Sequence, residues 1–150
     1  MTDGGPGFGR QIVTLPYLEE FPGGPRRPYL WMEFEGPSGA RGPVLGLVDT
    51  GADISVLPLG YAALMGFRAE DLDLFEIHGV GGQVDTYRPR DPIPAWVGGL
   101  EGIVVPMRPA FIEGGDALWG RSDFMAVFGV IVEESKSELS LILPPDATIP

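Results

Sequence analysis

Apolar and polar residues alternate along residues 29–35, and this is the clearest hydropathy pattern in the chain. A period of two is typical of a half-buried strand, because successive side chains of a strand point to opposite faces. The residues that would share the buried face are Leu30, Met32 and Phe34. A Gly-Pro-Ser-Gly turn follows at 36–39 and an apolar run at 43–48, so the pattern predicts a β-hairpin over residues 29–48.

Short apolar runs separated by glycine and proline make up most of the remaining chain, which contains 23 glycines and 16 prolines. This punctuation is typical of an all-β protein with many short strands. We expect further strands, single or paired in hairpins, over residues 11–15, 54–58, 75–84, 95–107, 128–132 and 139–143. Helical turns are expected over residues 59–67 and 122–128.

The length of 150 residues predicts a single domain over residues 1–150. The hydrophobic content of 44% is too high for a disordered chain. The two ends, residues 1–9 and 144–150, have the composition of frayed tails.

Composition and charge exclude several classes of function. The chain has no cysteine and His78 is its only histidine, so neither disulfides nor thiolate or multi-histidine metal sites are expected. A formal net charge of -11 repels phosphate backbones and argues against nucleic-acid binding. No apolar run is long enough to cross a membrane and no signal peptide is recognisable, so a cytoplasmic location is the default expectation.

One acidic residue stands in an unusual place. Asp49 follows the apolar pair Leu47 and Val48 directly, and a second apolar run begins at Ile54. Asp, Thr and Gly are turn residues, so the sequence Asp-Thr-Gly is compatible with a simple turn at the end of a strand. A carboxylate between two strand-like segments is nevertheless expected to be partly buried, which is costly unless a partner compensates it.

The stretch Asp49-Thr50-Gly51-Ala52 resembles the active-site motif of aspartic proteases, in the retropepsin branch of that family. Two further segments agree with the resemblance. The Gly-Val-Gly-Gly sequence at 79–82, whose Gly81 follows Asp49 by 32 positions, is similar to the tip of the retropepsin flap, although a plain hairpin turn would also account for it. Leu118-Trp119-Gly120-Arg121 is similar to the family's second signature, in which two hydrophobic residues precede Gly-Arg and a short helix.

The resemblance covers about residues 27–128 and implies a retropepsin-like closed β-barrel or sandwich. It further implies a flap hairpin, one short helix near residues 122–128 and an active site on the axis of a homodimer. The chain contains a single Asp-Thr-Gly, whereas bilobal pepsin-like enzymes need two such motifs. The second acid would therefore come from a second copy of the chain.

This arrangement implies a specific chemistry. Two Asp49 carboxylates in close contact would share one proton, and the pair would activate a water molecule for attack on a peptide carbonyl. By resemblance, Thr50 would hydrogen-bond across the dimer beneath the acids, and Gly51 would let the substrate backbone approach. The mechanism needs no metal or other cofactor.

The resemblance also assigns further residues to the site. The walls of an apolar cleft for an extended peptide are expected to include Leu47, Val56, Ile77, Val80 and Leu118. Further substrate contacts are expected from Ala52, Asp53, Gly79 and Gly81, and Asp53 with Arg121 matches a structural ion pair of the family. Leu118 and Trp119 are equally compatible with a plain core position, and Arg121 with a solvated charge. Trp119 is larger than the usual Ile or Leu, so it should need extra room and a partner for its N–H group.

The sequence thus favours an aspartic endopeptidase that acts on extended peptides as a homodimer. One alternative is a non-catalytic dimerisation or peptide-binding module with the same fold, because fold does not guarantee activity. Another is an unrelated β-barrel carrier with a chance Asp-Thr-Gly. A test of dimerisation distinguishes the unrelated carrier from the protease and the non-catalytic module. A test of peptide cleavage distinguishes the protease from the non-catalytic module.

Overall fold

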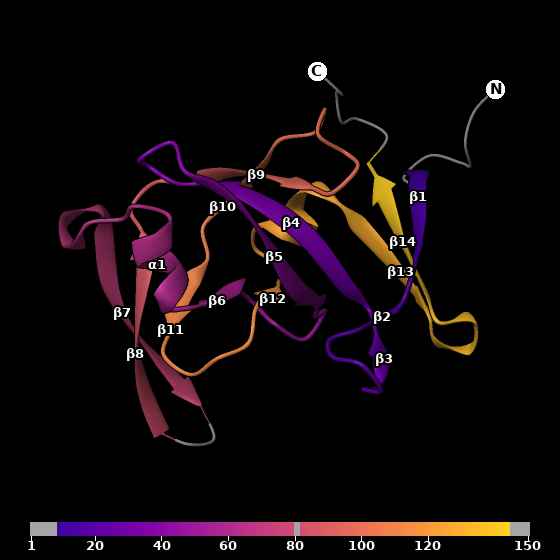
Figure 1. Ribbon diagram of the computed structural model, residues 1–150, viewed down its shortest axis with the longest axis horizontal. Helices are drawn as coiled ribbons and strands as arrows, with labels where there is room; N and C mark the ends of the chain where they lie inside the picture. Colours follow the sequence, from indigo (N-terminus) through magenta and orange to yellow (C-terminus); the bar gives the residue numbers. More distant parts are fainter. Residues whose placement is uncertain (1–8, 80–81, 145–150) are drawn as a thin grey trace.

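The computed structural model describes residues 9–79 and 82–144, and for residues 77–79 it describes only the backbone. The expected tails, residues 1–9 and 144–150, lie almost wholly outside the described residues, as do Val80 and Gly81 of the predicted flap tip. Most described residues belong to strands, so the fold class is all-β, as predicted (Figure 1).

One large sheet organises the molecule. Its strands follow the order β10 (Val105–Met107), β9 (Ile93–Val97), β4 (Tyr29–Glu35), β5 (Arg41–Val48), β12 (Leu118–Trp119), β6 (Val56–Pro58), β11 (Ala110–Ile112), β8 (Gly82–Pro89) and β7 (Leu72–Gly79). Neighbouring strands are antiparallel except for two pairs, β12 with β5 and β11 with β6, which are parallel.

A second sheet contains both ends of the described chain, and it lies on the far side of the molecule from the β7–β8 hairpin (Figure 1). Its order is β1 (Arg10–Pro16), β14 (Glu138–Leu143) and β13 (Gly129–Glu133). The predicted edge strand at 11–15 is therefore confirmed as β1. A small antiparallel ribbon is formed by β2 (Leu18–Glu19) and β3 (Arg26–Arg27).

The expected closed barrel is wrong for the described residues. The large sheet ends at β10 on one side and at β7 on the other, and these two strands do not pair with each other. Closure requires every strand to have two neighbours. Here β7 is the outer strand of a hairpin that projects from the body, and Pro106 in β10 has no N–H group to offer a further strand.

The helices are short and lie between strands. The described residues contain two α-helices, α1 (Gly60–Leu64) and α2 (Phe124–Val127), and two 3-10 helices, η1 (Ala69–Asp71) and η2 (Glu134–Lys136). Both α-helices lie within the ranges where helical turns were predicted. None of the helices within 9–79 and 82–144 has the length and apolar character that a membrane crossing requires.

The alternation along β4 is confirmed by burial. Leu30, Met32 and Phe34 are at most 2% exposed, whereas Trp31 on the opposite face is 48% exposed. Antiparallel pairing of β4 with β5 confirms the hairpin predicted over 29–48, and its turn is closed by a hydrogen bond from Gly39 N to Gly36 O of 2.9 Å.

Trp119 lies in the centre of this core and is fully buried. Its Nε1 donates a hydrogen bond of 2.9 Å to the carbonyl oxygen of Leu30, and its ring packs against Phe34 with centroids 5.5 Å apart. Room for the indole comes from Gly46, where a Cβ atom would overlap the Trp119 ring. Both expectations for Trp119 are therefore confirmed, and the residue anchors β12 beneath the strand that leads to Asp49.

Candidate functional site

Asp49 is the first residue after β5, and the main chain holds it firmly. Asp49 N donates to the carbonyl oxygen of Trp119 at 3.0 Å, and Asp49 O accepts from Ala52 N at 3.1 Å. The first bond continues the parallel pairing of β5 with β12, and the second closes a turn over residues 49–52. The Asp49 side chain is half-buried, whereas Thr50 and Gly51 are exposed.

Within the described part of the chain, the Asp49 carboxylate has one hydrogen-bond partner. Its Oδ1 accepts a hydrogen bond of 2.9 Å from Gly51 N, which orients the carboxylate within the turn. A Cβ atom at Gly51 would lie 3.2 Å from that oxygen, closer than an ordinary contact. No hydrogen bond to the other oxygen and no ion pair of Asp49 is found among residues 9–79 and 82–144, so one carboxylate oxygen remains available.

A second loop crosses the one that carries Asp49. Arg121 N donates to Ala52 O at 3.0 Å, and Ser122 N donates to Asp53 O at 2.9 Å. The two backbones approach so closely at Gly120 that a Cβ atom there would lie 2.6 Å from the Ile54 carbonyl. The glycine of the Leu-Trp-Gly-Arg segment is therefore required by the crossing of the loops.

Three of the predicted pocket residues lie in one row across the sheet. Leu118 is paired with Leu47 on one side and with Val56 on the other, and directly paired residues of neighbouring strands share a face. All three are half-buried, whereas Val48 and Trp119, their chain neighbours, point into the core. The row offers an apolar wall beside Asp49.

The predicted ion-pair residues are in contact. Arg121 Nη2 contacts Asp53 Oδ1, with both side chains largely exposed to solvent. An exposed pair of this kind contributes little to the stability of a single chain. The contact does, however, add a side-chain link to the two backbone hydrogen bonds between the crossing loops.

The predicted flap is a long hairpin of β7 and β8, paired from Leu72 with Pro89 to Gly79 with Gly82. Its base joins the body through the pairing of Tyr87 with Phe111 in β11. The hairpin forms one end of the large sheet and extends beyond the other strands in Figure 1. Val80 and Gly81, and the side chains of Ile77 and Gly79, lie outside what is described, so their contacts with substrate remain predictions.

A buried polar cluster behind the Asp49 loop was not predicted. Ser55 is fully buried and its Oγ donates to Asp123 Oδ1 at 2.5 Å, while Gly120 N donates to the same Oγ at 2.9 Å. Asp123 also accepts from Phe124 N at 2.7 Å, as the residue that caps α2. An aspartate just before a helical run is a capping signal in sequence, but the contact with Ser55 spans 68 positions and has no local signal.

The described residues contain no group of three or more Asp, Glu or His side chains that could hold a metal ion. The groups that converge on the site are a carboxylate, a hydroxyl, backbone amides and aliphatic side chains. Such a set can bind a peptide backbone and exchange protons with a water molecule.

Comparisons with known proteins returned a structural likeness. No protein-family model matches the chain, and no curated protein matches it either. Among solved structures, the chain is similar to the EIAV protease, which was solved in complex with the inhibitor HBY-793. The sequence identity is 26%, the TM-score is 0.49, and the match covers 64% of this chain and 83% of that protein.

Proposed function

We propose that this protein is an aspartic endopeptidase of retropepsin type that is active as a homodimer. The observation that carries the proposal is the setting of Asp49: an acid in an Asp-Thr-Gly turn, half-buried at the end of a core strand, with one carboxylate oxygen available. A simple strand-end turn would not need the crossing loop that holds Asp49 N and Ala52 O in place.

The chemistry follows from bringing two such turns together on a two-fold axis. Two carboxylates about 3 Å apart cannot both carry a full charge, so they share one proton. The charged carboxylate takes a proton from a water molecule as the water attacks the peptide carbonyl, and the protonated carboxylate donates to the carbonyl oxygen. Thr50 is exposed beside Asp49 and is available to bond across the axis.

The substrate is an extended peptide with apolar side chains next to the cleaved bond. The row of Leu47, Leu118 and Val56 supports this assignment, because it forms an apolar wall on the face beside Asp49. The β7–β8 hairpin would cover the peptide, and exposed main-chain groups would bind it as an added strand. Ala52 and Asp53 would contact the same peptide, since they follow directly in the turn.

The proposal is tested by incubating the full chain with a denatured protein mixture between about pH 4 and 7, where a carboxylate pair can hold a single proton. Asp49→Asn is the informative variant, because it is nearly isosteric and removes the acid. Asp91→Asn is the matched control, since Asp91 is an exposed acid in the turn before β9.

Cleavage by the native chain and by Asp91→Asn, with none by Asp49→Asn, is the expected result. Dimers without cleavage in any variant would favour the alternative of a non-catalytic dimerisation or peptide-binding module. A chain that neither cleaves nor dimerises at any of these pH values would contradict the family resemblance as well.

A further inference from the structure

Asp123 is a buried carboxylate outside the Asp-Thr-Gly turn. It is 6% exposed and lies at the start of α2, where three segments of the chain meet. Its Oδ1 accepts from Ser55 Oγ and from Phe124 N, and its Oδ2 accepts from Arg108 N at 3.1 Å. The three donors come from the loop after Asp49, from α2 and from the segment before β11.

We propose that Asp123 is a positioning residue, whose carboxylate holds Ser55 and thereby fixes the loop of residues 49–55 that presents Asp49; this inference rests on the function proposed for Asp49. Ser55 is linked to the neighbouring segments by three bonds. Its Oγ donates to Asp123, its Oγ accepts from Gly120 N, and its carbonyl oxygen accepts from Ala110 N at 2.8 Å. Movement of Ser55 would disturb the crossing of the two loops, and with it the turn that orients Asp49.

Both carboxylate oxygens of Asp123 are used as hydrogen-bond acceptors. All the partners of Asp123 are donors, and two of them are backbone N–H groups that cannot turn into acceptors. An asparagine would place its NH₂ group against Phe124 N in one orientation and against Arg108 N in the other. In either orientation the asparagine loses one of these bonds, whereas the two carboxylate oxygens of Asp123 accept all three.

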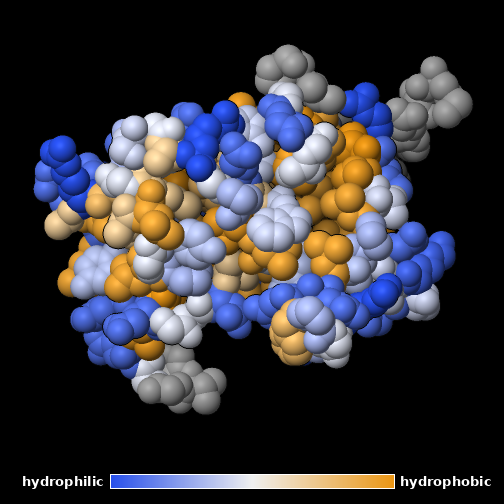
Figure 2. Space-filling view, in the orientation of Figure 1, coloured by the Kyte–Doolittle hydropathy of each residue, from blue (hydrophilic) through white to orange (hydrophobic). Residues whose placement is uncertain are grey.

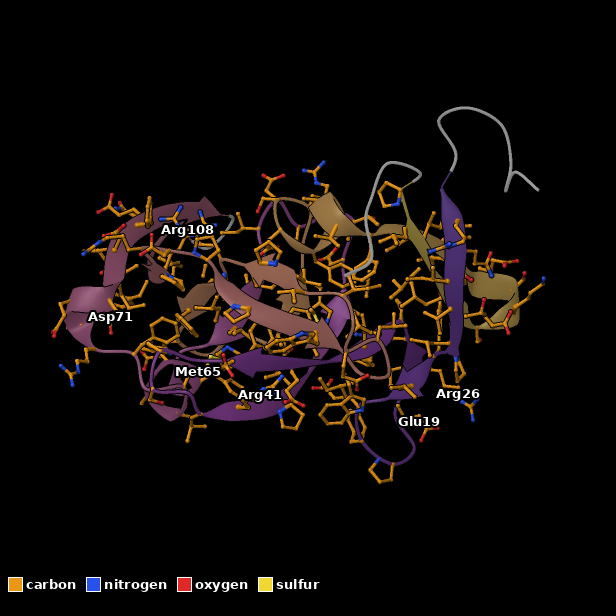
Figure 3. The ribbon with its side chains drawn as sticks, turned by 90° about the horizontal axis from the view of Figure 1, so that it is seen from above. Glu19, Arg26, Arg41, Met65, Asp71 and Arg108 are labelled. Carbon is orange, nitrogen blue, oxygen red and sulfur yellow. The ribbon has the colours of Figure 1, made fainter. Side chains whose placement is uncertain are left out.

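Two arginines, Arg88 and Arg108, lie near Asp123. The Arg88 guanidinium of β8 is half-buried, and burial and the Arg108 guanidinium lower the pKa of Arg88, while the Asp123 carboxylate raises it. Arg108 itself donates from Nε to the Pro89 carbonyl at 2.7 Å and lies 3.7 Å from an oxygen of Asp73. Arg108 is labelled beside the flap strands in Figure 3, far from Glu19 and Arg26 of the β2–β3 ribbon. The backbone of Arg108 thus bonds Asp123, while its side chain joins the same segment to the β7–β8 hairpin.

The test compares Asp123→Asn, Ser55→Ala and the double variant of the full chain. Ser140→Ala is the matched control, because Ser140 is also a buried serine, 2% exposed, but hydrogen-bonds Thr14 in the three-stranded sheet. With a peptide cut by the native chain, each single variant should lower kcat by about 10- to 100-fold and change KM little, as expected when reacting groups are misplaced. The double variant should lose no more than the worse single one, since both remove the same link. An unchanged kcat in Asp123→Asn, or additive losses in the double variant, would overturn the inference.

Amide hydrogen exchange separates this inference from the proposed function, because it needs no cleavage. The amides of Asp49, Arg121 and Ser122 should lose protection in Asp123→Asn and Ser55→Ala relative to the amides of β14, and should keep it in Ser140→Ala. If the native chain cleaves nothing but this loss occurs, the positioning role stands and the protease proposal fails. If the native chain cleaves and the loss does not occur, the positioning role fails alone.

Discussion

Trp119 and Gly46 show how one residue depends on the absence of a side chain at another. The indole fills the centre of the core and satisfies its N–H group on Leu30 O, which a buried tryptophan requires. It fits only because β5 has a glycine at the facing position. Since β12 and β5 together carry the Asp49 turn, this packing also fixes the site.

Replacing Gly46 by alanine should destabilise the protein. The new methyl group would overlap the Trp119 ring, and overpacking of a core costs about 1–3 kcal/mol. Gly42→Ala is the control, because Gly42 lies in the same strand with open space around its Cα. Urea unfolding should show a lower free energy of unfolding for Gly46→Ala alone, and equal values for the two variants would contradict this account of the core.

Two buried tyrosine side chains should make the free energy of unfolding fall at alkaline pH. Burial raises the pKa of Tyr17, and so does its hydrogen bond to Glu134. A folded-state pKa above the ordinary value means that the stabilisation is complete below about pH 10 and is lost as pH rises through the folded pKa. The same sign holds for Tyr29, whose pKa is raised by burial and then by Glu20.

The free energy of unfolding should therefore fall above about pH 10. The fall should be smaller in Tyr17→Phe and in Tyr29→Phe, each of which lacks one titrating phenol. Tyr87→Phe, on an exposed position of β8, serves as the control. Urea titrations between about pH 8 and 11 measure this slope, and an identical slope in all three variants would refute the assignment.

At the scale of elements, the β7–β8 hairpin contains two negative charges that repel each other across its strands. Glu76 and Asp85 are directly opposite each other in the β7–β8 pairing, and both are exposed. Like charges at such positions destabilise a strand pair, and a favourable pair contributes about 0.2–1 kcal/mol. The hairpin is thus weaker than its length suggests, which agrees with the proposal that it acts as a flap over the substrate.

Asp85→Lys should strengthen this hairpin and Asp85→Asn should do so to a smaller extent. Hydrogen exchange of the β7 and β8 amides should slow in that order, with little change in the rest of the protein. Asp91→Lys changes the charge equally outside the hairpin and should leave these amides unaffected. Faster exchange in Asp85→Lys would show that the cross-strand pair does not control the hairpin.

At the scale of the whole molecule, charge opposes assembly. A net charge of -11 makes two copies of the chain repel each other near neutral pH. Apolar surface nevertheless extends across the middle of the face in Figure 2 and over the three-stranded sheet, where Ile131 and Val132 of β13 are exposed. Charge and apolar area thus act in opposite directions on the proposed homodimer.

Association should strengthen as pH falls from about 7 to 5, because the negative charge shrinks while a proton enters the proposed Asp49 pair. Sedimentation at both pH values measures the change. In Asp49→Asn, the strengthening of association that comes from the smaller net charge should remain. The strengthening that comes from the shared proton should be lost. Tighter association at the higher pH would contradict the prediction.

Local patterns were enough to predict the hairpins, the burial of one face of β4 and the place of α2. The chemistry proposed for Asp49 rests on the resemblance of residues 49–52 to a family motif, which is itself a short stretch of sequence. These features depend on residues that are neighbours in the chain, where periodicity and turn preferences act directly.

Only the tertiary structure decided the features that join distant residues. The parallel pairing of β5 with β12 builds the row of Leu47 and Leu118, and the bond from Ser55 to Asp123 crosses 68 positions. The sheet also stays open instead of closing into the expected barrel. Periodicity cannot specify such contacts, because many pairings of short strands satisfy the same local pattern and packing of the whole core selects among them.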